Sequence, residues 1–231
     1  MSTIKENLEN INRNITEAAL KSGRKRDDVL LLAVSKTVDI ERMKEAYELG
    51  LHDMGENKPQ EIKRKYYEIE NVRWHQIGHL QTNKVKYIID KVCLIHSVDS
   101  LKLAEEIDKR AKAIGAVMDI LVEINIAGEE AKSGVPLDEA EKLALDISAL
   151  DNVRVKGLMT VAPFVEDPED NRKYFKAMKN LFVDIKAKKY NNIDMKYLSM
   201  GMTNDYIVAV EEGANIVRIG TGIFGARDYS K

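Results

Sequence analysis

Apolar positions follow two alternating patterns along this chain. Residues 29–35 (VLLLAVS) form an uninterrupted apolar run that ends at Lys36, which is typical of a parallel strand buried on both faces. Residues 3–22 instead place apolar side chains three or four positions apart, which predicts an amphipathic helix. Runs of the first kind and segments of the second kind then succeed each other along the rest of the chain.

This alternation predicts a definite set of elements. Strands are expected at residues 29–35, 52–55, 72–77, 92–96, 117–126, 153–161, 195–200 and 216–219. Helices are expected at residues 3–22, 39–49, 57–69, 81–90, 100–114, 137–149, 168–188 and 204–212. Because strictly alternating strands and helices imply a parallel sheet with right-handed crossovers, eight such units in 231 residues predict a single-domain (β/α)8 TIM-type barrel over residues 1–231, with an extra N-terminal helix. An open doubly wound sheet is the alternative, although it normally carries fewer strands in this length.

Composition excludes several classes of partner. Thirty-six basic and thirty-eight acidic side chains give a net charge of −2, which provides no electrostatic case for binding nucleic acid. We expect no membrane span, because no apolar run approaches the roughly 20 residues required. The charged N-terminus resembles no secretory signal, and one cysteine cannot form an intramolecular disulfide, so we expect a cytoplasmic protein. That cysteine, Cys93, lies in an apolar strand-like run and is expected to be buried and inert.

The C-terminal ends of the predicted strands carry the candidate chemistry. In a (β/α)8 barrel, functional residues lie at these ends and in the loops that follow them. Lys36 ends the first strand, on the same side as Leu32 and Val34 if side chains alternate. A solvated strand-end lysine is the simpler interpretation, but the other strand ends are rich in glycine and hydroxyl or amide residues, which favours a site.

The loops after the last two strands have the composition of an anion site. Residues 199–205 (SMGMTND) and 219–222 (IGTG) combine glycine, which lets the backbone approach a ligand, with hydroxyl groups. Loops seven and eight form the usual phosphate site of this barrel type. The alternative is ordinary turn chemistry, with Thr203 or Asn204 capping the next helix.

Arg218 is unusual because it lies between Val217 and Ile219 in an apolar strand. If those two side chains face the helices, Arg218 points into the barrel. A buried arginine needs a partner because its desolvation is costly. A salt bridge with an acid such as Glu123 and a contact with a ligand both remain open.

A metal site is not expected. His75 and His79 are four residues apart, but Gly78 and the predicted strand remove the helical spacing that would bring both rings together. No cysteine or carboxylate cluster nearby completes a zinc-ligand set.

The chain resembles the pyridoxal phosphate homeostasis proteins (the YggS/PROSC family) over nearly its whole length. Six motifs in the family's order carry the resemblance: residues 32–37 (LAVSKT), 55–57 (GEN), 75–84 (HQIGHLQTNK), 157–160 (GLMT), 198–205 (LSMGMTND) and 217–225 (VRIGTGIFG). One departure is mild: Thr203 stands where serine is expected, which keeps the hydroxyl group.

The resemblance implies a barrel similar to the N-terminal domain of alanine racemase that binds pyridoxal 5′-phosphate (PLP). Lys36 would be the Schiff-base lysine, and Arg218 would lie beside the pyridine nitrogen. The residues implied to hold the phosphate are Ser199, Thr203, Gly220 and Thr221. Those implied to line the cofactor are Asn57 and Met159. An arginine at the pyridine nitrogen disfavours its protonation, which makes PLP a poorer electron sink.

The implied function is therefore PLP (vitamin B6) homeostasis, in which the protein buffers or delivers the cofactor without turning over a substrate. Its partners would be PLP and apo-enzymes that need it, and we expect a monomer because a closed barrel requires no partner. A small PLP-dependent amino-acid racemase is the alternative. The sequence ends soon after the last predicted strand, so we expect no second domain to supply a racemase's opposing acid–base group. A class I aldolase-type barrel that uses Lys36 on a carbonyl substrate is a third hypothesis.

Overall fold

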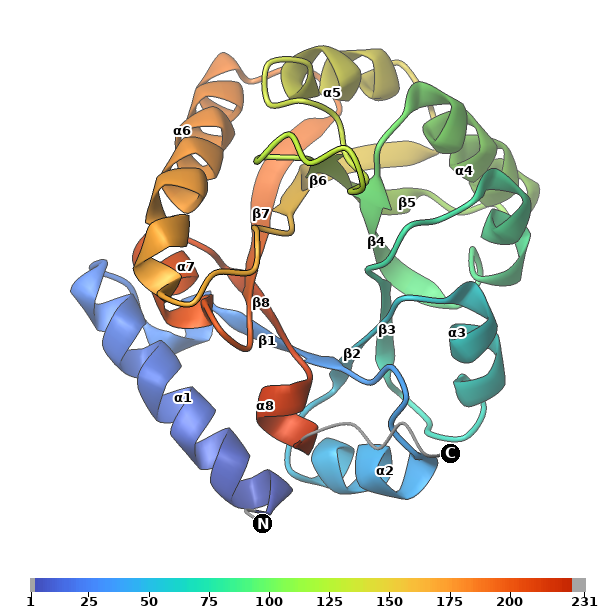
Figure 1. Ribbon diagram of the computed structural model, residues 1–231. Coiled ribbons are helices and arrows are strands. Elements are labelled where there is room, and N and C mark those ends of the chain that lie inside the picture. The colour runs from blue at the N-terminus through green and yellow to red at the C-terminus, as the bar shows by residue number, and fades with distance from the viewer. Residues whose placement is uncertain (1–2, 226–231) are drawn as a thin grey trace.

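The chain forms the expected closed barrel. The computed structural model describes residues 3–225 and contains eight parallel strands that pair in sequence order, with β8 completing the ring against β1 (Figure 1). Leu32 is in register with Arg218 across that closing pair. The first and last segments of the barrel are therefore neighbours, which brings together residues that are far apart in the sequence.

The elements follow the predicted alternation. The strands are β1 (Leu30–Val34), β2 (Asp53–Glu56), β3 (Arg73–Gln76), β4 (Val92–Val98), β5 (Met118–Ile124), β6 (Val153–Thr160), β7 (Ile193–Met202) and β8 (Ile216–Ile219). The α-helices are α1 (Ile4–Lys21), α2 (Ile40–Glu48), α3 (Pro59–Lys65), α4 (Leu101–Ala113), α5 (Ala140–Ser148), α6 (Arg172–Lys188), α7 (Tyr206–Glu211) and α8 (Thr221–Phe224). Short 3₁₀ helices are η1 (Arg26–Asp28), η2 (Thr82–Tyr87) and η3 (Pro168–Asn171).

The predicted helices at residues 81–90 and 57–69 differ most from the observed ones. The helix expected at residues 81–90 is the 3₁₀ segment η2, in which Lys84 N–H bonds to Gln81 O and Ile88 N–H to Val85 O. Such a short segment gains few α-helical hydrogen bonds to offset nucleation. The helix expected at residues 57–69 shortens to α3, which begins at Pro59, a residue favoured in a first turn.

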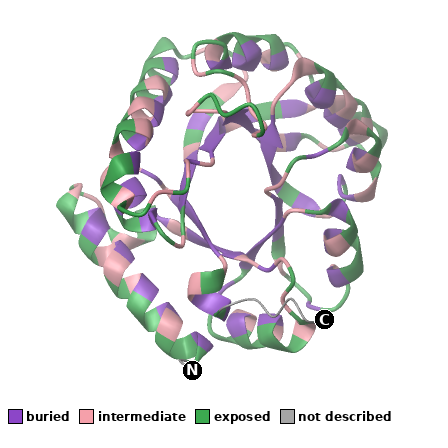
Figure 2. Ribbon diagram, in the orientation of Figure 1, coloured by how far each residue is buried: buried purple, intermediate pink, exposed green. Residues whose placement is uncertain are grey.

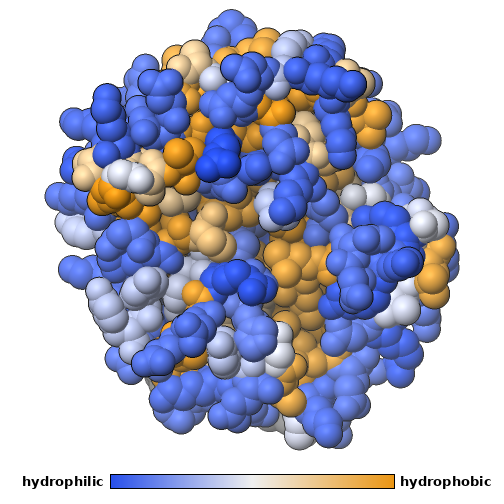
Figure 3. All heavy atoms as spheres, turned by 180° about the vertical axis from the view of Figure 1, so that it is seen from behind, coloured by the Kyte–Doolittle hydropathy of each residue, from blue (hydrophilic) through white to orange (hydrophobic). Residues whose placement is uncertain are grey.

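Burial follows the layers of the barrel. The strands are largely buried and the helices expose their outer faces (Figure 2). Inside the ring, an apolar cluster is formed by Leu32, Leu94, Leu121, Met159 and Ile216. Seen from behind, the molecule exposes mainly hydrophilic side chains, with hydrophobic ones between them near the centre (Figure 3). Among residues 3–225, no helix is long and apolar enough to cross a bilayer.

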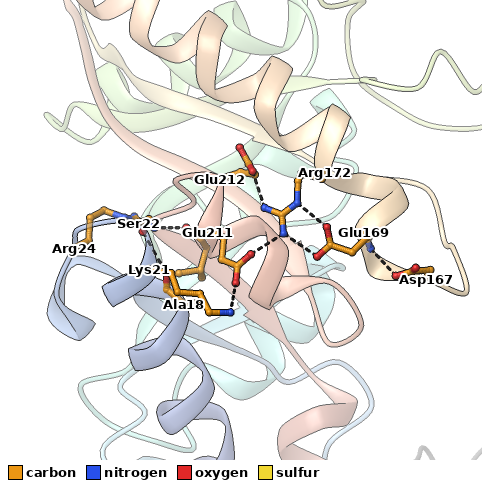
Figure 4. A network of polar contacts seen from close by, with 10 residues as sticks. Ala18, Lys21, Ser22, Arg24, Asp167, Glu169, Arg172, Glu211 and Glu212 are labelled. Carbon is orange, nitrogen blue, oxygen red and sulfur yellow. Dashed lines mark hydrogen bonds and ion pairs between the residues drawn. The ribbon is translucent and has the colours of Figure 1, made fainter.

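Helix α1 covers the outside of the barrel beside α7 and α8 (Figure 1). It starts at a capping box between Thr3 and Glu6, and Lys21 in its last turn bonds to Glu211 of α7 at 2.8 Å. Glu211 also contacts Arg172, whose guanidinium binds three carboxylates in all (Figure 4). This network ties α1, α6 and α7 together around one cation.

The expectation of a buried cysteine is wrong. Cys93 is exposed, although its Sγ lies 3.3 Å from the carbonyl of Trp74 and 3.4 Å from His75 Nε2. It is the second residue of β4, and side-chain alternation turns it to the opposite face from its buried neighbours Val92 and Leu94.

Candidate functional site

Lys36 lies in a tight turn directly after β1. Ser35 before it is fully buried, and Thr37 after it has a φ of 64°. A left-handed backbone is unfavourable for a β-branched residue, so the turn must be held by its surroundings. Ser35 N–H donates to Gly55 O at 3.1 Å, and Ser35 Oγ donates to Glu56 Oε1 at 2.7 Å. The peptide that carries Lys36 is thus fixed to the end of β2.

A fully buried ion pair contacts this turn through Ser35. Lys65 Nζ lies 2.6 Å from Glu56 Oε1 and donates to the carbonyl oxygen of Ser35 at 2.9 Å. Its side chain is 0% exposed. Nothing in the sequence singles out Lys65, because a lysine near the end of a helix normally projects into solvent.

The loops after β7 and β8 contact each other. Thr203 Oγ1 accepts a hydrogen bond from Gly222 N–H at 3.3 Å and lies 3.3 Å from Thr221 Oγ1. Neither Thr203 nor Asn204 caps α7: its cap residue is Asp205, and Asn204 instead donates to Val165 O. Helix capping therefore does not account for the position of the Thr203 hydroxyl group.

The two glycines of the loop after β8 lie in close quarters, and Gly220 packs against the first strand. A Cβ on Gly220 would lie 3.2 Å from Val34 O, two residues before Lys36, and one on Gly222 would lie 2.8 Å from Ile219 Cγ2. The two loops and the Lys36 turn consequently form one continuous edge of the barrel.

Arg218 points into the barrel, as side-chain alternation predicts, while Val217 and Ile219 lie in the outer core. Its Nη1 donates to Ser199 Oγ at 2.6 Å and its Nη2 to Thr160 O at 2.7 Å. The salt bridge considered with Glu123 is not among the ion pairs of residues 3–225. Burial lowers the pKa of Arg218 to about 10, which leaves the guanidinium charged at neutral pH.

Glu123 of β5 is a further buried ionisable group inside the barrel. It is 7% exposed, is in register with Met159, and its Oε2 is buried with no hydrogen-bond partner. Burial, with Asp99 nearby, raises the pKa of Glu123 to about 7, although Arg218 opposes the shift. An orphaned buried carboxyl oxygen of this kind is a group that a polar ligand can satisfy.

Ser199 contacts Arg218 and His96, both inside the barrel, and not Thr203 or Thr221. Sequence reasoning included Ser199 among the phosphate residues and missed His96 altogether. The available signal was its position two residues after Leu94, on the inward face of an apolar strand.

Asn57 and Met159 lie in different parts of the site. Asn57 follows β2, and its backbone packs closely against Gly78, where a Cβ would come within 2.6 Å of Asn57 O. Met159 is fully buried in the interior apolar cluster. His75 and His79 are not brought together: His75 contacts His96 and Asp53, whereas His79 contacts Ser133 and Asp99. Residues 3–225 contain no group of three or more His, Cys, Asp or Glu side chains placed to hold a metal ion.

Comparison with known proteins identifies the family. The model of the alanine racemase N-terminal domain matches residues 7–228. A pyridoxal phosphate homeostasis protein of Aquifex aeolicus is 46% identical over 226 residues, covering 97% of this chain and 98% of the relative. The chain belongs to the pyridoxal phosphate homeostasis protein family. A member from Escherichia coli K12 is 35% identical over 236 residues and the match covers 100% of both chains.

Solved structures agree with this membership. PipY of Synechococcus elongatus, solved with PLP bound, aligns with a TM-score of 0.84 at 28% identity, covering 96% of this chain and 100% of PipY. D-threonine aldolase of Filomicrobium marinum aligns with a TM-score of 0.72 at 18% identity, over 94% of this chain and 60% of that enzyme. The second likeness shows that the homeostasis family shares its barrel fold with larger proteins.

Proposed function

We propose that this protein binds PLP covalently through Lys36 and holds or delivers the cofactor without turning over a substrate of its own. The observation that carries the proposal is the junction of three loops at one end of the barrel. The Lys36 turn, the Thr203 loop and the Gly220–Gly222 loop are adjacent, because β7, β8 and β1 are consecutive strands. Membership of the PLP homeostasis family and the PLP-bound PipY structure support it.

The residues present fit the chemistry of PLP. Bound PLP supplies an aldehyde that combines with an amine and a pyridine ring that withdraws electrons. Lys36 is the amine at this edge, while the hydroxyl groups of Thr203 and Thr221 and the backbone N–H of Gly220 would be the donors to a phosphate. Asn57 and Met159 would line the cofactor.

Arg218 would face the pyridine nitrogen. A guanidinium group can donate hydrogen bonds but cannot accept them, so it favours a ring nitrogen that carries no proton. This suits storage of the cofactor better than carbanion chemistry. Ser199 would then support Arg218, with which it is hydrogen-bonded, and would not bind the phosphate.

Titration of the purified full chain with PLP tests the proposal. We expect a visible absorption band that borohydride reduction fixes to the protein and that Lys36→Ala abolishes, whereas Lys63→Ala, which changes an exposed lysine of α3, leaves it unchanged. A chain that takes up no PLP would contradict PLP binding and favour an aldolase-type use of Lys36.

Two further assays address what the bound cofactor does. We expect PLP to pass from the loaded protein to an apo-enzyme in the presence of a scavenger of free PLP. Racemisation of alanine well above the rate of free PLP would show instead that the protein is a racemase. Failure of transfer with retention of PLP would limit the function to storage.

A further inference from the structure

A continuous hydrogen-bond chain runs through the barrel below the proposed cofactor site. Arg218 Nη1 lies 2.6 Å from Ser199 Oγ, which lies 3.0 Å from His96 Nδ1. His96 Nε2 lies 3.0 Å from His75 Nδ1, and His75 Nε2 lies 3.1 Å from Asp53 Oδ1. These five residues come from β8, β7, β4, β3 and β2, and we call them the interior hydrogen-bond chain.

The two ends of the interior hydrogen-bond chain have opposite charges. Arg218 can only donate, and an ionised Asp53 can only accept. Burial disfavours the charge on Asp53, but hydrogen bonds from His75 and Arg73 outweigh it and lower the pKa of this carboxyl to about 2. Asp53 is therefore an anion at neutral pH, and His75 Nε2 must carry a proton to donate to it.

The direction of the remaining hydrogen bonds follows if both imidazoles are neutral. Burial lowers the pKa of His96 well below its ordinary value, and the Arg218 cation adds to the shift. With Nε2 of His75 protonated, its Nδ1 accepts from His96 Nε2, and His96 Nδ1 accepts from the Ser199 hydroxyl. In every hydrogen bond the donor is then on the Arg218 side and the acceptor on the Asp53 side. Neighbouring hydrogen bonds arranged in this way strengthen each other.

The charges around this chain are few and unevenly placed. Besides its own members, the titratable or charged groups that face it are Arg73 on β3, Cys93 on β4, Glu123 on β5 and Tyr197 on β7, and Asp205 also acts on Arg218. Arg73 is 59% exposed and pairs with Asp53, so one end of the chain reaches solvent at the start of β2 and β3. His75, His96 and Ser199 are all buried.

We propose that His96 and His75 are positioning residues that hold Arg218 in place for the cofactor. As a neutral pair they link the guanidinium, through Ser199, to the carboxylate of Asp53 near the opposite end of the barrel. Among the described residues Arg218 forms no ion pair, so the buried cation is oriented through Ser199 and not through a salt bridge. This inference rests on the proposed function, since Arg218 is assigned to the pyridine nitrogen there.

The first test needs no cofactor and no substitution within the interior hydrogen-bond chain. The protein has four histidines, so nitrogen NMR of the imidazoles, with His52→Gln and His79→Gln to assign the exposed pair, reports the tautomer of the other two. We expect both buried rings to be neutral at pH 7 with the proton on Nε2. A proton on Nδ1 of either ring, or a charged His96, would overturn the proposed direction of the chain.

The second test measures whether His96 acts through Arg218. We expect His96→Phe to weaken PLP binding roughly tenfold, as loss of a supporting partner commonly does for a liganding side chain. In an Arg218→Met background, the same change should have less than about a twofold effect. An equal loss in both backgrounds would show that His96 acts independently of Arg218 and would refute the proposal.

Controls separate this inference from the proposed function. His52→Gln, which alters an exposed histidine packed edge-on against Tyr47, should not change PLP affinity. If His96→Phe does not fold, His96→Gln keeps a donor and an acceptor and should bind PLP more tightly than His96→Leu. Equal affinities of these two variants would contradict a polar positioning role. If the wild-type protein binds no PLP, the proposed function is wrong. The tautomers of His75 and His96 still test the direction of the interior hydrogen-bond chain in that case.

Discussion

Lys65 Nζ lies 2.6 Å from Glu56 Oε1, and the two side chains are 0% and 1% exposed. The pair sits directly behind the turn that presents Lys36, because Lys65 also binds Ser35 O and Glu56 binds Ser35 Oγ. A buried charge pair contributes little net stability compared with apolar residues of similar size, but breaking it leaves one charge unpaired. Its value here is to fix the Ser35–Lys36 peptide.

Replacement of Lys65 is therefore expected to be strongly destabilising. Lys65→Met should lower the free energy of unfolding by about 3–5 kcal/mol, since the Glu56 carboxylate would remain buried without its partner. Urea denaturation measures the change. Lys63→Met, on the exposed side of the same helix, is the matched control and should have an effect within about 0.5 kcal/mol. A small effect of Lys65→Met would show that the pair is not held as described.

Glu123 should make stability depend on pH. Its folded pKa of about 7 exceeds the ordinary glutamate value of 4.5, so between these values the folded state binds more protons than the unfolded state. The unfolding free energy of the wild type relative to Glu123→Gln should therefore fall as pH rises from 4.5 to 7, by at most about 3 kcal/mol. Denaturation of both proteins at several pH values checks this. The exposed Glu130→Gln should show no such trend, and a parallel pH dependence of wild type and Glu123→Gln would contradict the prediction.

Arg218 should matter more for binding than for folding. Replacing a buried cation by an apolar side chain of similar length removes its desolvation cost, so Arg218→Met should change the unfolding free energy by less than about 2 kcal/mol. PLP affinity should fall roughly 10- to 100-fold, because a charged hydrogen-bond donor to the ligand is lost. Thermal denaturation and PLP titration of one preparation compare the two effects. Unchanged affinity and an unchanged PLP spectrum would show that Arg218 does not contact the cofactor.

Thr203 should contribute its hydroxyl group to the phosphate. Thr203→Val keeps the shape of the side chain and removes one donor, so PLP affinity should fall about 3- to 10-fold, whereas Thr203→Ser should retain most of it. Thr16→Val, on α1, is a control that loses a hydroxyl bonded only to the backbone of its own helix. Pyridoxal, which lacks the phosphate, should bind wild type and Thr203→Val equally well. A similar loss with pyridoxal would place Thr203 away from the phosphate.

Local sequence was sufficient to predict the order of elements. Apolar periodicity separated strands from helices, and strict alternation selected the barrel, which fixed the end of the barrel where Lys36, Thr203 and Gly220 would lie. The inward direction of Arg218 also followed, because alternation along a strand depends only on backbone geometry. Where periodicity was weak, as in η2, the type of helix was wrong.

Tertiary structure alone decided which polar side chains meet. Lys65 looks like a solvated helical lysine in sequence, yet closure of the barrel buries it against Glu56, nine residues earlier. His75, His96 and Ser199 lie on separate strands, and their contacts depend on the stagger of β3, β4 and β7 around the ring. Sequence spacing cannot encode such contacts, because a hydrogen bond depends on tenths of an ångström in the packing of distant segments. The chain by itself thus determined a barrel with a lysine at its functional end, and the fold determined what supports that lysine and what lies beneath Arg218.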